Sequence, residues 1–294
     1  MKFLFCNNIL KPKNIDEAFI FEYESAINNG FDVMLFNFEE KSVEKIKPNN
    51  KMEDVIYRGW MLKPIEYSKL YYELEFKNYR LINTPAEYKN CHYLPESLKF
   101  IRKFTPKTIF QKIDNNNSIN ILLNNAKIFN GKPVIIKDYV KSEKHYWNTA
   151  CYVENSYDIE KLKKAIENLL ELRENDLNEG IVIREYVELN KLGNHPKSNM
   201  PLSEEYRIFF YKNKLLCLFN YWEEGNYNTE KPNIKEFENI AKTIESNFFT
   251  MDIAKDKKGE FIIIELGDGQ VAGISENQDK NIIYENIKKR QTSA

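Results

Sequence analysis

Short apolar runs alternate with segments of helical spacing in the first hundred residues of the chain. We predict strands for the apolar runs, and helices for the segments in which apolar residues recur every three or four positions. The predicted strands are 2–6, 32–36, 55–59 and 80–83, and the predicted helices are 15–28 and 65–76. This alternation favours an α/β domain with a mostly parallel sheet.

Arg58 stands at the carboxyl end of one of these predicted strands, directly before Gly59. Ligands of parallel sheets bind beyond the carboxyl ends of the strands. Arg58 is therefore a candidate contact for an anionic group of a substrate. An exposed arginine that binds no ligand is the alternative interpretation, and the sequence leaves both open.

The pattern changes after Thr105, where paired strands replace the alternation of strand and helix. The run Asn115-Asn116-Asn117 predicts a polar loop, and Lys212-Asn213-Lys214 predicts the turn of a hairpin. The predicted strands are 133–139, 180–189, 204–211, 215–219, 248–254 and 261–264, and the predicted helices are 158–173 and 234–246. We expect an α/β domain at 1–104, followed by a small α+β lobe at 105–180 and a large α+β lobe at 181–294, each lobe with an antiparallel sheet.

Two of these strands carry an acid in an unusual place. Asp252 lies inside the apolar run 248–254, and Glu265 directly follows the run 261–264. Burying an unpaired carboxylate is costly, so such an acid usually has a cation or a ligand beside it. The turn Lys257-Lys258-Gly259 would pair the strands and bring the two acids face to face. Converging carboxylates suit a Mg²⁺–nucleotide site, whereas acids on a solvated strand face are the alternative.

Composition and charge argue against several classes of protein. The chain has 43 basic and 44 acidic residues and a net charge of −1, so no overall field attracts nucleic acid or a membrane surface. No apolar run is long enough to span a membrane. The four cysteines, Cys6, Cys91, Cys151 and Cys217, form no CxxC pair. We expect buried thiols in a cytoplasmic protein, without membrane or nucleic-acid partners.

The candidate residues follow one another in a characteristic order. A strand-borne lysine, Lys137, comes first, then a strand that ends in acids, then the pair Glu205 and Arg207, and finally the two acids of the last strands. This order resembles the ATP-grasp superfamily over about residues 105–275, and the segment 1–100 resembles the α/β domain that precedes it. The strings 137–142 and 267–271 are similar to those of a little-characterised ATP-grasp clade common in phages and bacteria.

The resemblance implies a role for each candidate residue. The nucleotide cofactor is ATP, with Mg²⁺ as the metal and Mn²⁺ as its substitute. Lys137 would contact the phosphates, Glu188 or Glu205 the ribose, and Arg207 the transferring phosphoryl group. The metal acids would be Asp252 and Glu265. The adenine would meet the backbone of the segment made of Glu185, Tyr186, Val187 and Glu188.

The sequence departs from the ATP-grasp pattern at two places. The family usually has a glycine-rich loop after the lysine strand, whereas residues 138–147 contain no glycine. Lys141 or Lys144 would have to supply the missing positive charge. The family also has an asparagine two positions after the metal glutamate, where this chain has Gly267. Asp268 or Gln270 would then complete the metal site.

The activity implied is that of a carboxylate–amine ligase that uses ATP and Mg²⁺ and acts through an acyl-phosphate. Its substrates would be small molecules or peptides, such as an amino acid, with Arg58, Trp222 and Gln270 as further candidate contacts. A phosphotransferase on the same fold and a nucleotide-binding protein without turnover are the alternatives. A nucleic-acid ligase with a covalent lysyl-AMP is disfavoured, because its motif needs a glycine where Val140 stands.

Overall fold

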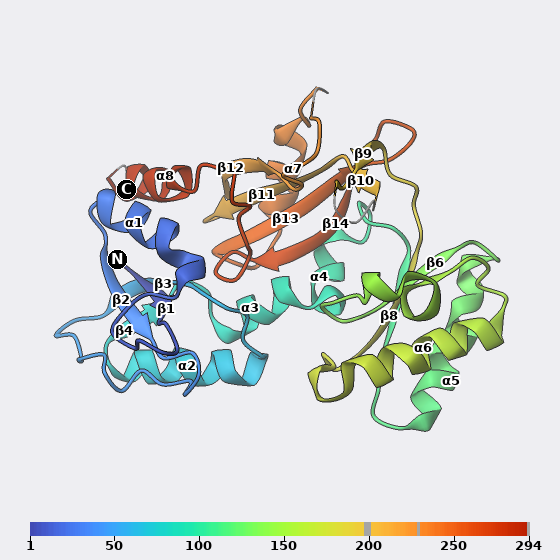
Figure 1. The fold of residues 1–294 in the computed structure, drawn as a ribbon, viewed down its shortest axis with the longest axis horizontal. Helices are drawn as coiled ribbons and strands as arrows, with labels where there is room; N and C mark the ends of the chain where they lie inside the picture. The colour runs from blue at the N-terminus through green and yellow to red at the C-terminus, as the bar shows by residue number, and fades with distance from the viewer. Residues whose placement is uncertain (197–200, 228–229, 293–294) are drawn as a thin grey trace. The chain divides into compact units, whose positions relative to one another are not determined.

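The computed structural model describes residues 1–196, 201–227 and 230–292 (Figure 1). The chain folds as two compact units, each built from separate stretches of sequence. The first unit contains residues 1–92, 191–253 and 266–294, and the second contains residues 93–190 and 254–265. Each unit is described by itself below. The three-part division expected from the sequence follows the chain, whereas these units interleave along it.

The first unit begins with a parallel sheet of four strands in the order β2-β1-β3-β4. Phe3 and Phe5 point to the same face of β1, where they pack against Tyr284 and Tyr23 of two helices. Figure 1 shows these helices, α8 and α1, above the strands and α2 below them. The strands are β1 (Lys2–Cys6), β2 (Asp32–Phe36), β3 (Glu53–Arg58) and β4 (Tyr79–Leu81), and the helices are α1 (Ile20–Asn28), α2 (Pro64–Phe76), α3 (Pro85–His92) and α8 (Asn281–Thr292). The predicted parallel sheet is confirmed.

A second sheet of four strands has the order β12-β11-β13-β14. Its first two strands form an antiparallel hairpin whose turn is Lys212 and Asn213, both with positive φ, and the predicted hairpin turn is confirmed. The strands are β11 (Glu205–Tyr211), β12 (Lys214–Asn220), β13 (Phe248–Lys255) and β14 (Phe261–Asp268). A short antiparallel pair, β9 (Lys191–Asn194) with β10 (Pro201–Ser203), and helix α7 (Ile234–Ala241) also belong to the first unit. The end of β13 and most of β14 lie in the stretch 254–265, which belongs to the second unit.

The second unit contains an antiparallel sheet in the order β5-β8-β6-β7. Its strands are β5 (Thr108–Lys112), β6 (Val134–Asp138), β7 (Tyr152–Val153) and β8 (Gly180–Glu185), and its helices are α4 (Leu94–Ile101), α5 (Asn116–Asn125) and α6 (Ile159–Arg173). Val134, Ile136, Ile181 and Ile183 belong to one core with residues of α5 and α6. The residues that alternate with them, among them Lys137 and Arg184, therefore project from the opposite face.

Some segments differ from the expectations. The polar run at 115–117 starts a helix, because the Asn115 side chain accepts a hydrogen bond from the Asn117 amide and caps α5. The predicted strand 180–189 ends at Glu185. Short helical turns lie at Glu17–Phe19, Ala126–Phe129, Lys144–Tyr146 and Glu174–Asp176, and a π-helical turn lies at Trp147–Cys151.

Arg58 is enclosed within the first unit and is only 1% exposed. Its Nε and Nη2 donate to the Glu22 carboxylate at 2.7 and 2.8 Å, and Nη1 donates to the Gly269 carbonyl at 2.5 Å. Tyr284 also donates to Glu22, at 2.7 Å. Burial alone would lower the pKa of Arg58, but the charge and hydrogen bonds of Glu22, together with Tyr284, outweigh burial and the net direction is upward. These internal partners favour a structural role, and the substrate contact of Arg58 stays a prediction.

Replacing Glu22 by Gln should destabilise the first unit strongly. The substitution leaves the buried Arg58 guanidinium without its counter-charge, and removing one partner of a buried pair typically costs about 3–5 kcal/mol. Urea unfolding followed by circular dichroism measures the free energy. The matched control, Asp54→Asn, breaks the exposed Arg80–Asp54 pair and should cost about 0–1 kcal/mol. Equal losses in the two variants would contradict the proposed importance of the buried pair.

Candidate active site

Lys137 and Glu265 form an ion pair within the second unit. Lys137 lies on β6 and its side chain is 10% exposed, whereas the Glu265 side chain on β14 is 34% exposed. The Lys137 Nζ donates to the Glu265 Oε2 at 2.9 Å. The predicted phosphate lysine and one of the predicted metal acids therefore neutralise each other in this structure.

Arg184 reaches the backbone of the same segment of β14. Its Nη1 donates to the Ile264 carbonyl at 2.5 Å and its Nη2 to the Ile263 carbonyl at 3.1 Å, and Nη2 also bonds to Thr105. Burial lowers the pKa of Arg184 to about 10, partly opposed by the charge of Glu265. Lys137 and Arg184 thus hold three consecutive residues of β14.

The sequence interpretation missed Arg184. The feature of the sequence that could have revealed Arg184 is its position. It is a basic residue directly after the apolar run Ile181-Val182-Ile183, in a strand that is buried on both faces. Its partners are carbonyl groups distant in sequence, which no local motif reveals.

Arg207 and Asp252 form a second ion pair, in the first unit. The Arg207 Nε and Nη2 donate to the two oxygens of Asp252 at 2.8 and 2.7 Å, which is the bidentate geometry typical of arginine. The Arg207 Nη1 donates to the Gly273 carbonyl at 2.9 Å, and the guanidinium carbon lies 4.9 Å from the centre of the Tyr221 ring. Asp252 is 3% exposed, so most of its negative charge is compensated inside the protein.

A cavity of about 300 Å³ opens beside Arg207 in the first unit. It offers a cation, an amide and a hydroxyl together with aromatic and aliphatic surface. The lining residues are Arg207, Phe219, Asn220, Tyr221, Gly273, Ile274 and Ser275. Trp222, a predicted substrate contact, follows directly in the chain, and its buried indole N–H has no hydrogen-bond partner among the described residues.

The predicted adenine segment continues β8 in the second unit. Glu185 accepts from Lys132 at 2.6 Å, and Glu188 pairs with Lys257 at 2.5 Å. Tyr186 packs edge-on against Tyr152 and Trp147, with ring centres 5.2 and 6.1 Å apart. Val187, which follows Tyr186 in the chain, is half-buried.

Glu205 begins β11 and is 8% exposed. It accepts a hydrogen bond from the Ser203 hydroxyl, while its own carbonyl accepts one from the Tyr227 hydroxyl at 2.7 Å. The contact of Glu205 with a ribose stays a prediction.

Asp268 and Gln270 belong to a buried network of the first unit. The Asp268 oxygens accept from the Asn83 side chain at 2.5 Å and from the Gln270 amide at 2.9 Å, and Gln270 in turn donates to Tyr67 at 2.7 Å. Burial raises the pKa of Asp268 to about 7, against the opposing effect of these hydrogen bonds. Both oxygens are used internally, which favours a structural role. The assignment of Asp268 as a metal ligand, and that of Gln270 to the metal or a substrate, stay predictions.

Gly267 leaves no room for the asparagine that the resemblance implies at its position. A Cβ atom there would meet the Thr250 Oγ1 at 2.6 Å, closer than real Cβ contacts. The neighbouring strand thus accounts for the glycine in physical terms.

A comparison with known protein families identifies the family of this chain. Residues 129–287 match the family described as ATP-grasp domain, R2K clade family 3. The chain belongs to this family. The ATP-grasp resemblance inferred from the sequence is confirmed, whereas nothing in the comparisons supports a phage origin.

Several solved ATP-grasp structures share the whole fold. D-cycloserine synthetase DcsG aligns with a TM-score of 0.62 over 99% of both chains at 11% identity. The ATP-grasp ligase PsnB, complexed with a minimal precursor, Mg and ADP, aligns with a TM-score of 0.59 at 13% identity, over 99% of this chain and 98% of that one. D-alanine–D-alanine ligase from Bacillus anthracis, complexed with ATP, aligns with a TM-score of 0.57 at 16% identity over 99% and 98%. The predicted fold class is confirmed. No curated protein matches.

The case for a metal site in this ATP-grasp chain depends on which side chains could donate oxygen ligands to the ion. Within the described ranges, no group of three or more His, Cys, Asp and Glu side chains is arranged to hold an ion. Mg²⁺, however, often takes only one or two protein carboxylates and completes its shell with phosphate oxygens and water. Asp252 in the first unit and Glu265 in the second are each hard oxygen donors, so the chemistry of each fits the ion. No described helix is long and apolar enough to cross a membrane.

The stability of this ATP-grasp protein should fall as Asp268 ionises. The pKa of Asp268 is about 7 in the folded state and 3.8 for an ordinary aspartate. The folded state therefore binds more protons between these values, and its free energy of unfolding decreases as the pH rises through this window, by up to about 1.4 kcal/mol per pH unit.

Urea unfolding of the wild type and Asp268→Asn at pH 5 and pH 8 measures this effect. The stability of the wild type should decline relative to that of the variant, which carries no titratable group at position 268. Parallel pH profiles of the two proteins would contradict the assignment.

Proposed function

We propose that this protein is an ATP- and Mg²⁺-dependent ligase that joins a carboxylate to an amine. The observation that carries the proposal is the pairing of Lys137 with Glu265 and of Arg207 with Asp252, in a chain of the ATP-grasp family. The cations and the acids that such a reaction needs already lie against one another.

Phosphoryl transfer asks a protein mainly for positioning and neutralisation of charge. Lys137 would act as a point charge on the phosphates of ATP, and Arg207 would offer its planar fork to the transferring phosphoryl group. Asp252 and Glu265 would each offer a carboxylate to Mg²⁺, which would supply positive charge at the phosphates. Lys137 and Arg207 would then exchange their carboxylate partners for phosphate oxygens, so that neither cation loses its counter-charge.

The reaction has two steps. A substrate carboxylate oxygen attacks the γ-phosphorus of ATP and releases ADP, which forms an acyl-phosphate. The lone pair of an amine then attacks the acyl carbon, phosphate leaves and the amine loses a proton. The nucleotide would lie with its adenine at residues 185–188 and its ribose near Glu205.

An amino acid or peptide is the substrate class that the chemistry of the cavity favours. The cavity beside Arg207 has the volume of a small ligand and combines a cation with polar and aromatic surface. Of the similar structures, one is a D-cycloserine synthetase, one a D-alanine–D-alanine ligase, and one is complexed with a peptide precursor. Trp222 follows the lining residue Tyr221 in the chain, and its buried indole N–H, which has no partner among the described residues, is a candidate donor to such a substrate.

Nucleotide binding should depend on the Lys137–Glu265 ion pair. Calorimetric titration with ATP and Mg²⁺ should give clear binding to the wild type and weaker binding to Lys137→Ala and Glu265→Gln. The rate of ADP release with an accepted substrate should fall about 10²–10³-fold in each, because each variant removes one preorganised charge. Lys2→Ala is a matched control, since Lys2 is also a strand-borne lysine in an ion pair, with Asp32 at 2.6 Å.

The outcomes separate the candidate functions. A screen of amino acids and short peptides should release ADP and phosphate together. Release of ADP without phosphate would favour a phosphotransferase, and binding without any ADP would favour a non-catalytic nucleotide-binding protein. A folded wild type that binds no ATP would refute the proposal.

A further inference from the structure

The chain turns sharply directly after Lys137, at the position where the glycine-rich loop was expected. Asp138 ends β6 and its side chain is fully buried. Its Oδ1 accepts hydrogen bonds from the amides of Val140 and Lys141, at 2.6 and 2.5 Å. The Asp138 amide donates to the Lys141 carbonyl at 2.9 Å and closes the turn. A carboxylate thus organises a turn that contains no glycine.

The other oxygen of this carboxylate binds side chains from the end of helix α6 and beyond. Arg173, the last residue of α6, donates from Nε to the Asp138 Oδ2 at 3.1 Å, and from Nη1 to the Glu143 Oε1 at 3.2 Å. The Asn178 side chain donates to the same Asp138 oxygen at 2.8 Å. We call Asp138, Arg173, Glu143 and Asn178 the Asp138 anchor.

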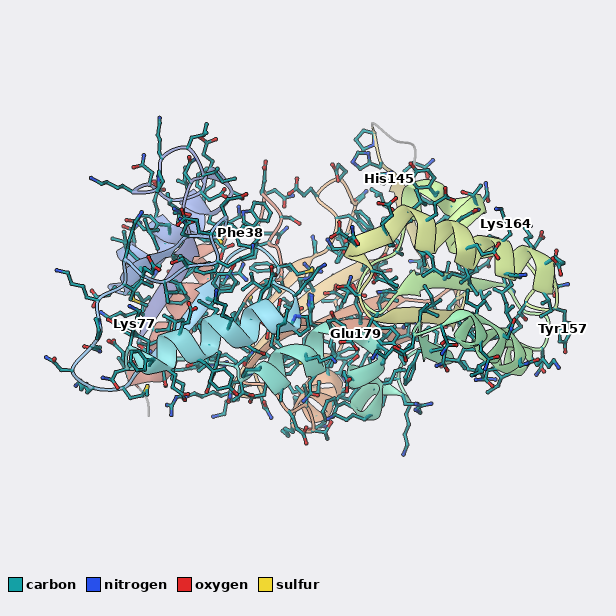
Figure 2. The ribbon with its side chains drawn as sticks, turned by 90° about the horizontal axis from the view of Figure 1, so that it is seen from below. Phe38, Lys77, His145, Tyr157, Lys164 and Glu179 are labelled. Carbon is teal, nitrogen blue, oxygen red and sulfur yellow. The ribbon has the colours of Figure 1, made fainter. Side chains whose placement is uncertain are left out.

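The anchor fixes both ends of the segment 138–143 to the body of the second unit. The Asp138 side chain is inaccessible, that of Arg173 is 13% exposed and that of Glu143 is 21% exposed. Charge-assisted hydrogen bonds of this kind are about twice as strong as neutral ones, because one or both partners carry a full charge. The helical turns that follow, at 144–151, expose Lys144 and also His145, which Figure 2 labels near α6.

We propose that the Asp138 anchor takes the place of the glycine-rich loop, and that its members are positioning residues for phosphate recognition by lysine. The amides of Val140 and Lys141 already donate to Asp138, so they do not form a backbone cradle. Recognition then falls to the ammonium groups of Lys141 and Lys144, together with that of Lys137. The anchor fixes the backbone of Lys141, which follows Lys137 by four positions in the chain. This inference rests on the proposed function, because it presupposes that ATP binds at Lys137.

The alternative is an anchor that only stabilises the fold, and coupling between substitutions distinguishes the two. If Arg173 positions Lys141, then Lys141→Ala should weaken ATP binding in the wild type but have little further effect in Arg173→Gln. If Arg173 is merely structural, the two effects on ATP affinity should add. Conservative Arg173→Lys keeps the charge but loses the fork, so it should restore part of the affinity.

The experiment measures ATP affinity by calorimetry with Mg²⁺ in the wild type, Arg173→Gln, Lys141→Ala and the double variant. We expect losses of about 10–100-fold in each single variant, the range for hydrogen bonds to charged groups, and nearly the same loss in the double variant. Hydrogen exchange at the Val140 and Lys141 amides should be faster in Arg173→Gln. Arg80→Gln is the control, since it breaks an exposed Arg–Asp pair on the first unit and should leave ATP affinity unchanged.

The results distinguish failure of the anchor proposal from failure of the proposed function. A wild type that binds ATP, with additive losses or unchanged amide exchange in Arg173→Gln, would overturn the role of the anchor and leave the proposed ligase intact. A wild type that binds no ATP would overturn both. Should Arg173→Gln not fold, Glu143→Gln gives the same comparison, because it removes the charge at the other end of the Arg173 fork.

Discussion

The pairing of cations and carboxylates on different strands is the interaction on which the rest of the candidate site depends. Lys137 and Asp252 are almost fully buried, and a lone charge at that depth would cost more free energy than a typical domain can spare. Each therefore has a partner of opposite sign, Glu265 in one unit and Arg207 in the other. The residues that could bind a polyanion and a cation are thus the same residues that link β6 to β14 and β11 to β13.

The side chains of a strand alternate between its two faces, and this alternation separates Lys137 and Arg184 from the apolar core of the small sheet. On β6 and β8 the apolar residues Val134, Ile136, Ile181 and Ile183 pack with the helices, and Lys137 and Arg184 project from the other face. A shift of one residue in either strand would turn the charges into the core. The register of this small sheet is therefore fixed by both its apolar and its polar face.

The sequence allowed prediction of what is local or follows a family pattern. The parallel sheet, the hairpin at Lys212 and Asn213 and the ATP-grasp family were all predictable, because alternation, turn residues and motif order are visible along the chain. The partners of buried charges were not. Arg58 stands at a strand end as expected, but its partner Glu22 lies 36 positions away, and Arg184 binds carbonyls 79 and 80 positions away. The asparagine run at 115–117 suggested a loop because a helix cap and a loop use the same residue type.

The strands β13 and β14 carry the chain out of the first unit and back, and this route sets an order of assembly during synthesis. Lys137 and Arg184 leave the ribosome long before Ile263, Ile264 and Glu265, which complete their surroundings. The stretch 93–190 thus emerges with two cations that lack their partners, and the whole segment 191–253 must follow first. Such contacts between distant parts of a chain form slowly. The second unit consists of only two stretches of sequence. Its last stretch, 254–265, is nevertheless synthesised only after residues 1–92 and 191–253 of the first unit.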